Sequence, residues 1–175
     1  MGHDFNQLIC RINQKLELVT EWCNSNKLKL NPTKSEIMIV SNRDFDSNSS
    51  PDVLVGGNPI VFTDNFKYLG VFVDSKLKFK YQIKNLKSKL NSLCGVSYRL
   101  KNHFNLQSAR MMYYSCVYSV VTYCIAVWGG VFECVRRSEI LCKLHKRILN
   151  NLFRKFYPDS PCIFKSCKLL KLRDI

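Results

Sequence analysis

Hydrophobic residues recur at helical spacing in the first part of the chain. Between residues 5 and 22 they recur every three or four positions, with one adjacent pair, and most residues between them are polar. The polar run Asn24–Asn26 then ends the pattern. This spacing predicts an amphipathic helix of about five turns. Its apolar positions are Phe5, Leu8, Ile9, Ile12, Leu16, Val19 and Trp22.

Short apolar runs replace this pattern as far as residue 62. They have the length and composition of strands, and lie at 28–30, 37–40, 53–55 and 60–62. The last two flank Gly56–Pro59, which predicts a β-hairpin closed by a glycine turn. Residues 41–52 are rich in Ser, Asn and Asp, and predict an exposed loop.

The run Phe66–Asp74 is apolar on both faces when it is read as a strand. Such a pattern favours a buried strand over one at a solvated edge. One face holds Lys67, Leu69, Val71 and Val73, and the other holds Phe66, Tyr68 and Phe72.

Helical spacing returns after Asp74. One stripe consists of Ile83, Leu86, Leu90, Leu93, Ser97 and Leu100. A second helix is predicted over 105–128 and a third over 133–156, whose apolar face holds Leu141, Leu144, Ile148 and Leu152. The chain is therefore predicted to be α+β: one helix and about five short strands, followed by an all-helical part.

The segment 111–132 holds 22 uncharged residues, which meets the length of a membrane span. It also holds four tyrosines and ends near Gly129–Gly130, and true spans are richer in Leu, Ile and Val. A buried core helix is the favoured interpretation, and a membrane helix is the alternative.

Charge is segregated along the sequence. Residues 1–74 hold 7 basic and 9 acidic residues, a net charge of −2, whereas residues 75–175 hold 20 and 4, a net charge of +16. No acidic residue occurs between Ser75 and Phe132. This asymmetry favours a polyanionic partner, with nucleic acid ahead of an acidic membrane surface.

The nine cysteines show no Cys-x-x-Cys spacing, and the three histidines are dispersed. The pattern favours free thiols in a reduced, intracellular protein over a disulfide framework or a zinc site. The cysteine pattern does not distinguish a cytoplasmic protein from a nuclear one.

Paired carboxylates that could hold Mg²⁺ are scarce. The close pairs are Glu17 with Glu21, which suits a solvated helix face, and Asp44 with Asp46, which lies in the polar loop. Lys80, Lys84 and Lys87 share one flank of the predicted helix, beside its apolar stripe. They favour contacts with phosphates, and a solvated helix flank is the alternative.

Several short segments, taken in order, resemble the reverse transcriptases of non-LTR retrotransposons, jockey-like elements in particular. The resemblance covers essentially the whole chain. The segments are Trp22–Asn26, Lys27–Ser35, Lys67–Gly70 with Asp74, Tyr123, Trp128–Gly129 and Leu169–Leu172.

The resemblance implies roles for particular residues. Lys34 matches the lysine of the palm segment called motif D, which is proposed to act as a general acid for the pyrophosphate leaving group. A turn lysine in solvent is the alternative for Lys34. Tyr68, Leu69 and Gly70 match the primer grip, a hairpin that positions the primer's 3′ end. The basic helices would form the thumb, which grips the template–primer duplex.

The resemblance departs at the metal site. The family's aspartate pair, which binds Mg²⁺ in the full-length enzyme, should precede the first helix, and this sequence holds no such pair. The chain is therefore expected to be an inactive fragment that binds no metal. Its partners would be the RNA/DNA template–primer duplex and the missing N-terminal fingers and palm portion.

The expected domains of this fragment are 1–78, a palm remnant, 79–157, a helical thumb, and 158–175, the start of a post-thumb region. The alternative is a standalone, non-catalytic nucleic-acid-binding protein.

Overall fold

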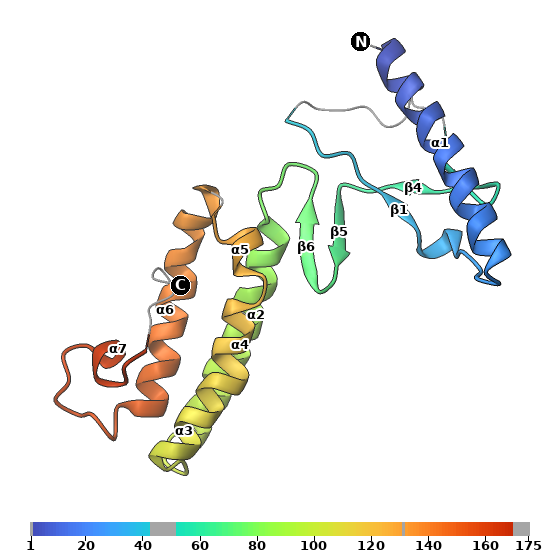
Figure 1. Ribbon diagram of the computed structural model, residues 1–175. Helices are drawn as coiled ribbons and strands as arrows, with labels where there is room; N and C mark the ends of the chain where they lie inside the picture. The colour runs from blue at the N-terminus through green and yellow to red at the C-terminus, as the bar shows by residue number, and fades with distance from the viewer. Residues whose placement is uncertain (1, 43–51, 131, 170–175) are drawn as a thin grey trace. The chain divides into compact units, whose positions relative to one another are not determined.

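The computed structural model describes residues 2–42, 52–130 and 132–169, and its fold is α+β (Figure 1). The chain divides into two compact units. The first consists of Met1–Tyr68 with Asp74–Leu77, and the second of Leu69–Val73 with Lys78–Ile175. Most of the predicted loop, including the Asp44 and Asp46 pair, lies outside the described residues.

The first unit is built on the predicted amphipathic helix, α1 (Gly2–Ser25). Its C-terminus is closed by hydrogen bonds from the Lys27 and Leu28 amides to the Asn24 and Cys23 carbonyls, with Lys27 at φ +57°. This is a Schellman motif with lysine at the usual glycine position. The predicted strand at 28–30 is therefore wrong, because Leu28 completes the end of the helix.

Short strands follow. The 3₁₀ turn η1 (Pro32–Lys34) leads into β1 (Glu36–Ile37), which pairs in parallel with β4 (Val61–Phe62). The predicted glycine hairpin forms with a shorter turn than expected: β2 (Leu54–Val55) pairs antiparallel with β3 (Asn58–Pro59) across Gly56 and Gly57, both at positive φ. Asn58 and Pro59 therefore belong to the second strand and not to the turn, and most of the expected second strand is β4, which pairs with β1. Two positive φ values in a two-residue turn are what the twist of a hairpin favours.

The Asn13 side chain ties α1 to this hairpin. Its Nδ2 donates to the Asp52 carbonyl at 3.0 Å, and its Oδ1 accepts from the Leu54 amide at 3.0 Å. One amide side chain thus satisfies a donor and an acceptor of the incoming strand.

The stretch Phe66–Asp74 is not the single buried strand that its pattern predicts. It forms β5 (Asn65–Tyr68) and β6 (Val71–Asp74), which pair as a two-stranded sheet. The chain reverses at Leu69 and Gly70, whose φ angles are +46° and +85°. Tyr68 and Leu69 are 62% and 73% exposed.

The second unit is mainly a helical bundle (Figure 1). The helices α2 (Lys80–Leu100) and α6 (Phe132–Phe153) run in the same direction (Figure 1). Their C-terminal parts are joined by Asn151 of α6, which donates to the Cys94 carbonyl and the Ser97 hydroxyl of α2. Between α2 and α6 in sequence, residues 106–128 form the middle column, which runs the opposite way (Figure 1). The short α7 (Ile163–Ser166) packs on α6.

The middle column begins at the predicted position but is not one continuous α-helix. Asn105 caps α3 (Leu106–Met112), which continues as the π-helical segment η3 (Tyr113–Tyr118) and α4 (Ser119–Thr122). The backbone then leaves the helix at Tyr123 and Cys124, where φ of Cys124 is +51°, before α5 (Ile125–Trp128).

By length and apolar composition, Leu106–Trp128 could cross a membrane, and it is the one such segment among the described residues. Within the bundle its inward side packs on α2 and α6, through Ala109, Tyr113, Val117 and Val121. The break before α5 also interrupts the continuous hydrogen bonding that a simple span has.

The bundle core combines the predicted stripes with residues that the stripes omitted. Ile83, Leu86, Leu90 and Ser97 are buried as expected, whereas Leu100 is 40% exposed. Among the side chains that the structure describes, the buried polar ones are Gln82, Ser97 and His145. The cysteines whose side chains the structure describes are free thiols.

Candidate nucleic-acid interface

The turn between β5 and β6 holds a leucine in a backbone conformation that leucine disfavours. A left-handed conformation costs an L-residue about 1–2 kcal/mol, because Cβ approaches the following carbonyl oxygen. Gly70, at φ +85°, has no Cβ and adopts its conformation freely. The pairing of β5 with β6 favours positive φ at both turn positions, and the leucine backbone also has a support from outside the hairpin.

That support comes from the break in the middle column. The Tyr123 hydroxyl donates to the Leu69 carbonyl across 54 residues of sequence. Its ring lies over Gly70, with Cε1 3.5 Å from the position that a Cβ on Gly70 would occupy. The turn thus contacts both the polar end and the ring of one tyrosine.

Tyr123 is itself fixed by the bundle core. The Trp128 indole Nε1 donates to the Tyr123 carbonyl at 2.9 Å, and Trp128 is buried. Gly129 follows, where an added Cβ would lie 2.6 Å from the Ile125 carbonyl oxygen. The C-terminal end of α5 is therefore held by the Trp128 indole on the Tyr123 carbonyl and by the close approach of Gly129 to the Ile125 carbonyl.

A second side chain holds the strand that leaves the turn. Gln82, on the first turn of α2, is buried and accepts a hydrogen bond from the Phe72 amide at 3.1 Å through its Oε1. Val71, beside Phe72, is buried in the bundle core. These contacts attach β6 to the N-terminal end of α2.

The predicted lysines lie along that same part of α2. Lys80, Lys84 and Lys87 are all exposed, and their spacing places them on one flank of the helix. Phe79 precedes the helix without a side-chain cap, and the first turn has no acidic residue. The partial positive charge of the helix N-terminus adds to that of the lysines, so this flank attracts anions.

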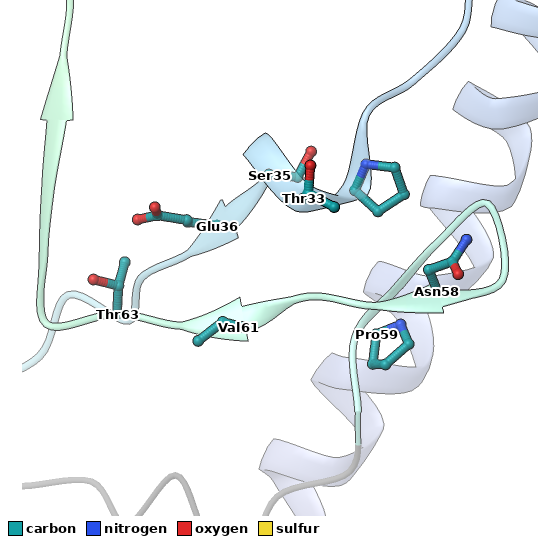
Figure 2. A pocket seen from close by; sticks show the side chains of 8 residues that line it. Thr33, Ser35, Glu36, Asn58, Pro59, Val61 and Thr63 are labelled. Carbon is teal, nitrogen blue, oxygen red and sulfur yellow. The ribbon is translucent and has the colours of Figure 1, made fainter.

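Lys34, the predicted motif D lysine, ends the turn η1 in the first unit and is exposed. The Asn31 side chain shapes this turn by accepting from the Thr33 amide and hydroxyl. A cavity of about 670 Å³ lies beside it, and Figure 2 shows Thr33, Ser35 and Glu36 on one of the segments that line it and Val61 and Thr63 on another. The lining residues do not include Lys34.

The structure thus gathers one part of the predicted site. Leu69, Gly70 and β6 lie with α2, which carries the three lysines, and Tyr68 ends the strand that enters the turn. Lys34 belongs to the other unit. Gln82 was missed, although a polar residue beside Ile83 in an apolar stripe is a signal for a buried hydrogen bond.

A second polar group that the sequence interpretation missed lies deep in the bundle. His145 is 1% exposed, its Nε2 lies 3.1 Å from the Tyr113 hydroxyl, and its Nδ1 has no partner. Its ring stacks on Tyr113 and meets the edge of Phe164. Burial lowers the pKa of His145 from 6.5 to about 4 and raises that of Tyr113, so both side chains are neutral near pH 7.

The described residues do not fit a magnesium ion. No group of three His, Cys, Asp or Glu side chains lies together among them. Glu17 and Glu21 are exposed on α1, one turn apart, as a solvated helix face predicts. We therefore derive no step through Mg²⁺ from this part of the chain.

Among known proteins, no family model, curated protein or solved structure matches this chain.

Proposed function

We propose that this chain is the palm–thumb part of a reverse transcriptase of the non-LTR, jockey-like retrotransposon type, and that it contributes template–primer binding. The lysine flank of α2 contacts the phosphates of the duplex. The exposed turn Tyr68–Leu69–Gly70 lies against the primer's 3′ end. The first unit is the palm remnant, and its partner is the fingers and palm portion of the parent polymerase.

The observation that carries this proposal is the attachment of the turn to the lysine-bearing helix. Gln82 lies between Lys80 and Lys84 in sequence but points to the opposite side, where it holds β6. One helix therefore presents the lysines to solvent and fixes the strand that follows the turn. The 3′ end of the primer and the phosphates next to it would then contact parts of the structure that are fixed to the same helix, α2.

Phosphate contacts supply the affinity in this mechanism. Each lysine that neutralises a phosphate releases condensed counterions, so binding weakens as salt rises. Such contacts fix the position of a duplex without reading its sequence. Since the sequence contains no adjacent aspartate pair, we expect binding without primer extension in the presence of Mg²⁺.

The test compares the protein with its triple variant Lys80→Gln, Lys84→Gln and Lys87→Gln. In a salt titration with an RNA/DNA hybrid, the slope of log affinity against log salt should flatten by about 0.7–0.9 for each phosphate that is no longer neutralised. Lys89→Gln is the matched control, because Lys89 is also exposed on α2 but lies half a turn away from the flank. An unchanged slope in the triple variant would show that these lysines do not contact the phosphates and form only a solvated helix flank.

A standalone, non-catalytic nucleic-acid-binding protein is the second candidate, since the lysine flank serves either function. The two differ at the turn. A primer-grip turn favours a hybrid with a recessed 3′ end over a blunt hybrid of equal length, whereas a backbone-binding module binds both equally. Competition between these two hybrids distinguishes the candidates.

A further inference from the structure

The Leu69 conformation is not explained by the leucine side chain. That side chain is 73% exposed, so little packing holds it in place. The backbone is nonetheless left-handed, which an asparagine or glycine would adopt far more readily. The Leu69 carbonyl makes a long-range contact, since it accepts a hydrogen bond from the Tyr123 hydroxyl.

Tyr123 is well placed to impose a conformation from a distance. Its amide ends the α4 helix by donating to the Ser119 carbonyl, and its own carbonyl accepts from the buried Trp128. The backbone between these two bonds turns away from helical geometry, with ψ of Tyr123 at +116°. An uninterrupted helix would aim this side chain in a different direction, so the break sets where the hydroxyl points.

We propose that Tyr123 is a positioning residue that holds the Leu69–Gly70 turn in its left-handed conformation, through its hydroxyl on the Leu69 carbonyl and its ring on Gly70. The role of that turn in binding a primer end rests on the function proposed above. The conformational role of Tyr123 does not depend on it.

The primary test is Tyr123→Phe, which removes the hydroxyl and keeps the ring. The nuclear Overhauser contact between the ring and the Gly70 α protons should weaken, and the Leu69 chemical shifts should move away from left-handed values. Affinity for a recessed-3′ RNA/DNA hybrid should fall by about fivefold, the factor for one ordinary hydrogen bond. Tyr114→Phe is the matched control, because Tyr114 and Tyr123 are both 49% exposed on the middle column.

A rescue experiment separates positioning from general packing. Leu69→Asn places a residue that tolerates the left-handed conformation before Gly70, which gives the preferred Asn-Gly hairpin turn. In this background Tyr123→Phe should alter neither the turn nor the affinity. A loss of bundle packing at Tyr123 would not be repaired by a change at Leu69.

The outcomes are distinct. If Tyr123→Phe leaves the Leu69 shifts and the Gly70 contact as they are in the unmodified protein, the positioning role is overturned. If the turn loosens and Leu69→Asn restores it while hybrid affinity never changes, Tyr123 positions the turn but the turn does not bind the primer end. A joint loss and a joint rescue support both.

Discussion

Buried polar side chains define particular contacts within the helical bundle. Gln82 satisfies an amide of β6, and Ser97 accepts from Asn151 while donating to the Cys94 carbonyl. His145 differs, because one of its ring nitrogens, Nδ1, has no partner. Burial of a polar group without a partner disfavours its charged form, so the protonation of this imidazole is linked to folding.

The buried imidazole predicts a specific loss of stability in acid. Burial lowers the pKa of His145 from 6.5 to about 4, so the unfolded chain binds one more proton than the folded chain between those values. The free energy of unfolding should therefore fall as pH drops from about 6.5 to about 4, by on the order of 3 kcal/mol, and this group adds no further loss below that range. Urea unfolding at several pH values measures it.

The control for this pH effect uses two variants. His145→Gln keeps an acceptor for Tyr113 but does not titrate, so its stability should decline less over the same pH range. His103→Gln changes an exposed histidine and should follow the unmodified protein. Equal pH dependence in His145→Gln and the unmodified protein would assign the acid sensitivity to other groups.

At the scale of elements, periodicity in the sequence predicts the helices but not the points where they stop or bend. The apolar stripes locate α1, α2 and α6, and on α2 and α6 most of the stripe is buried. On α1, by contrast, Leu8, Val19 and Trp22 of the predicted stripe are exposed. The Gly56–Gly57 hairpin is also predictable, since two glycines favour its turn.

The hairpin at Leu69 and the break at Cys124 are not predictable from local sequence. Both residues are left-handed without being Gly, Asn or Asp, so contacts of their neighbourhood in the fold override the preference of the residue type. At Leu69 the contact comes from Tyr123, which is far away in sequence, and α5, which follows Cys124, is held by the buried Trp128. The exposed lysines of the candidate interface follow directly from helical spacing, whereas its supporting side chains do not.

The attachment of β6 to α2 predicts a penalty for changing Gln82. Gln82→Leu removes the acceptor of the Phe72 amide and leaves that donor without its partner beside the core. The free energy of unfolding should fall by about 1–3 kcal/mol. Chemical denaturation measures it, and hybrid affinity should fall in parallel if the turn binds the primer end.

Gln107→Leu is the matched control for this change. Gln107 is exposed on α3, so its replacement should alter the free energy of unfolding by less than about 0.5 kcal/mol. If Gln82→Leu is as neutral as the control, the hydrogen bond to Phe72 contributes little to the docking of β6.

At the scale of the whole molecule, the two units differ in how much apolar surface they bury. Among the described residues, the bundle has a contiguous core that includes Leu90, Tyr113, Ile148 and Phe153. The buried apolar residues of the first unit are Ile9, Cys23, Val53 and Val55, whereas Trp22 on α1 is 61% exposed. Because burial of apolar area dominates folding stability, the first unit is expected to open at lower free energy.

Hydrogen exchange tests this difference between the units. Amides of α1 should exchange with an opening free energy at least about 2 kcal/mol below that of α2 and α6, roughly a thirtyfold difference in rate. Asn13→Ala removes the link between α1 and the β2–β3 hairpin and should speed exchange in α1 further while leaving α2 unchanged. Gln14→Ala, at the neighbouring exposed position, is the control. Equal opening free energies in α1 and α2 would show that both units unfold together. In that case the small core of the first unit would not limit its stability.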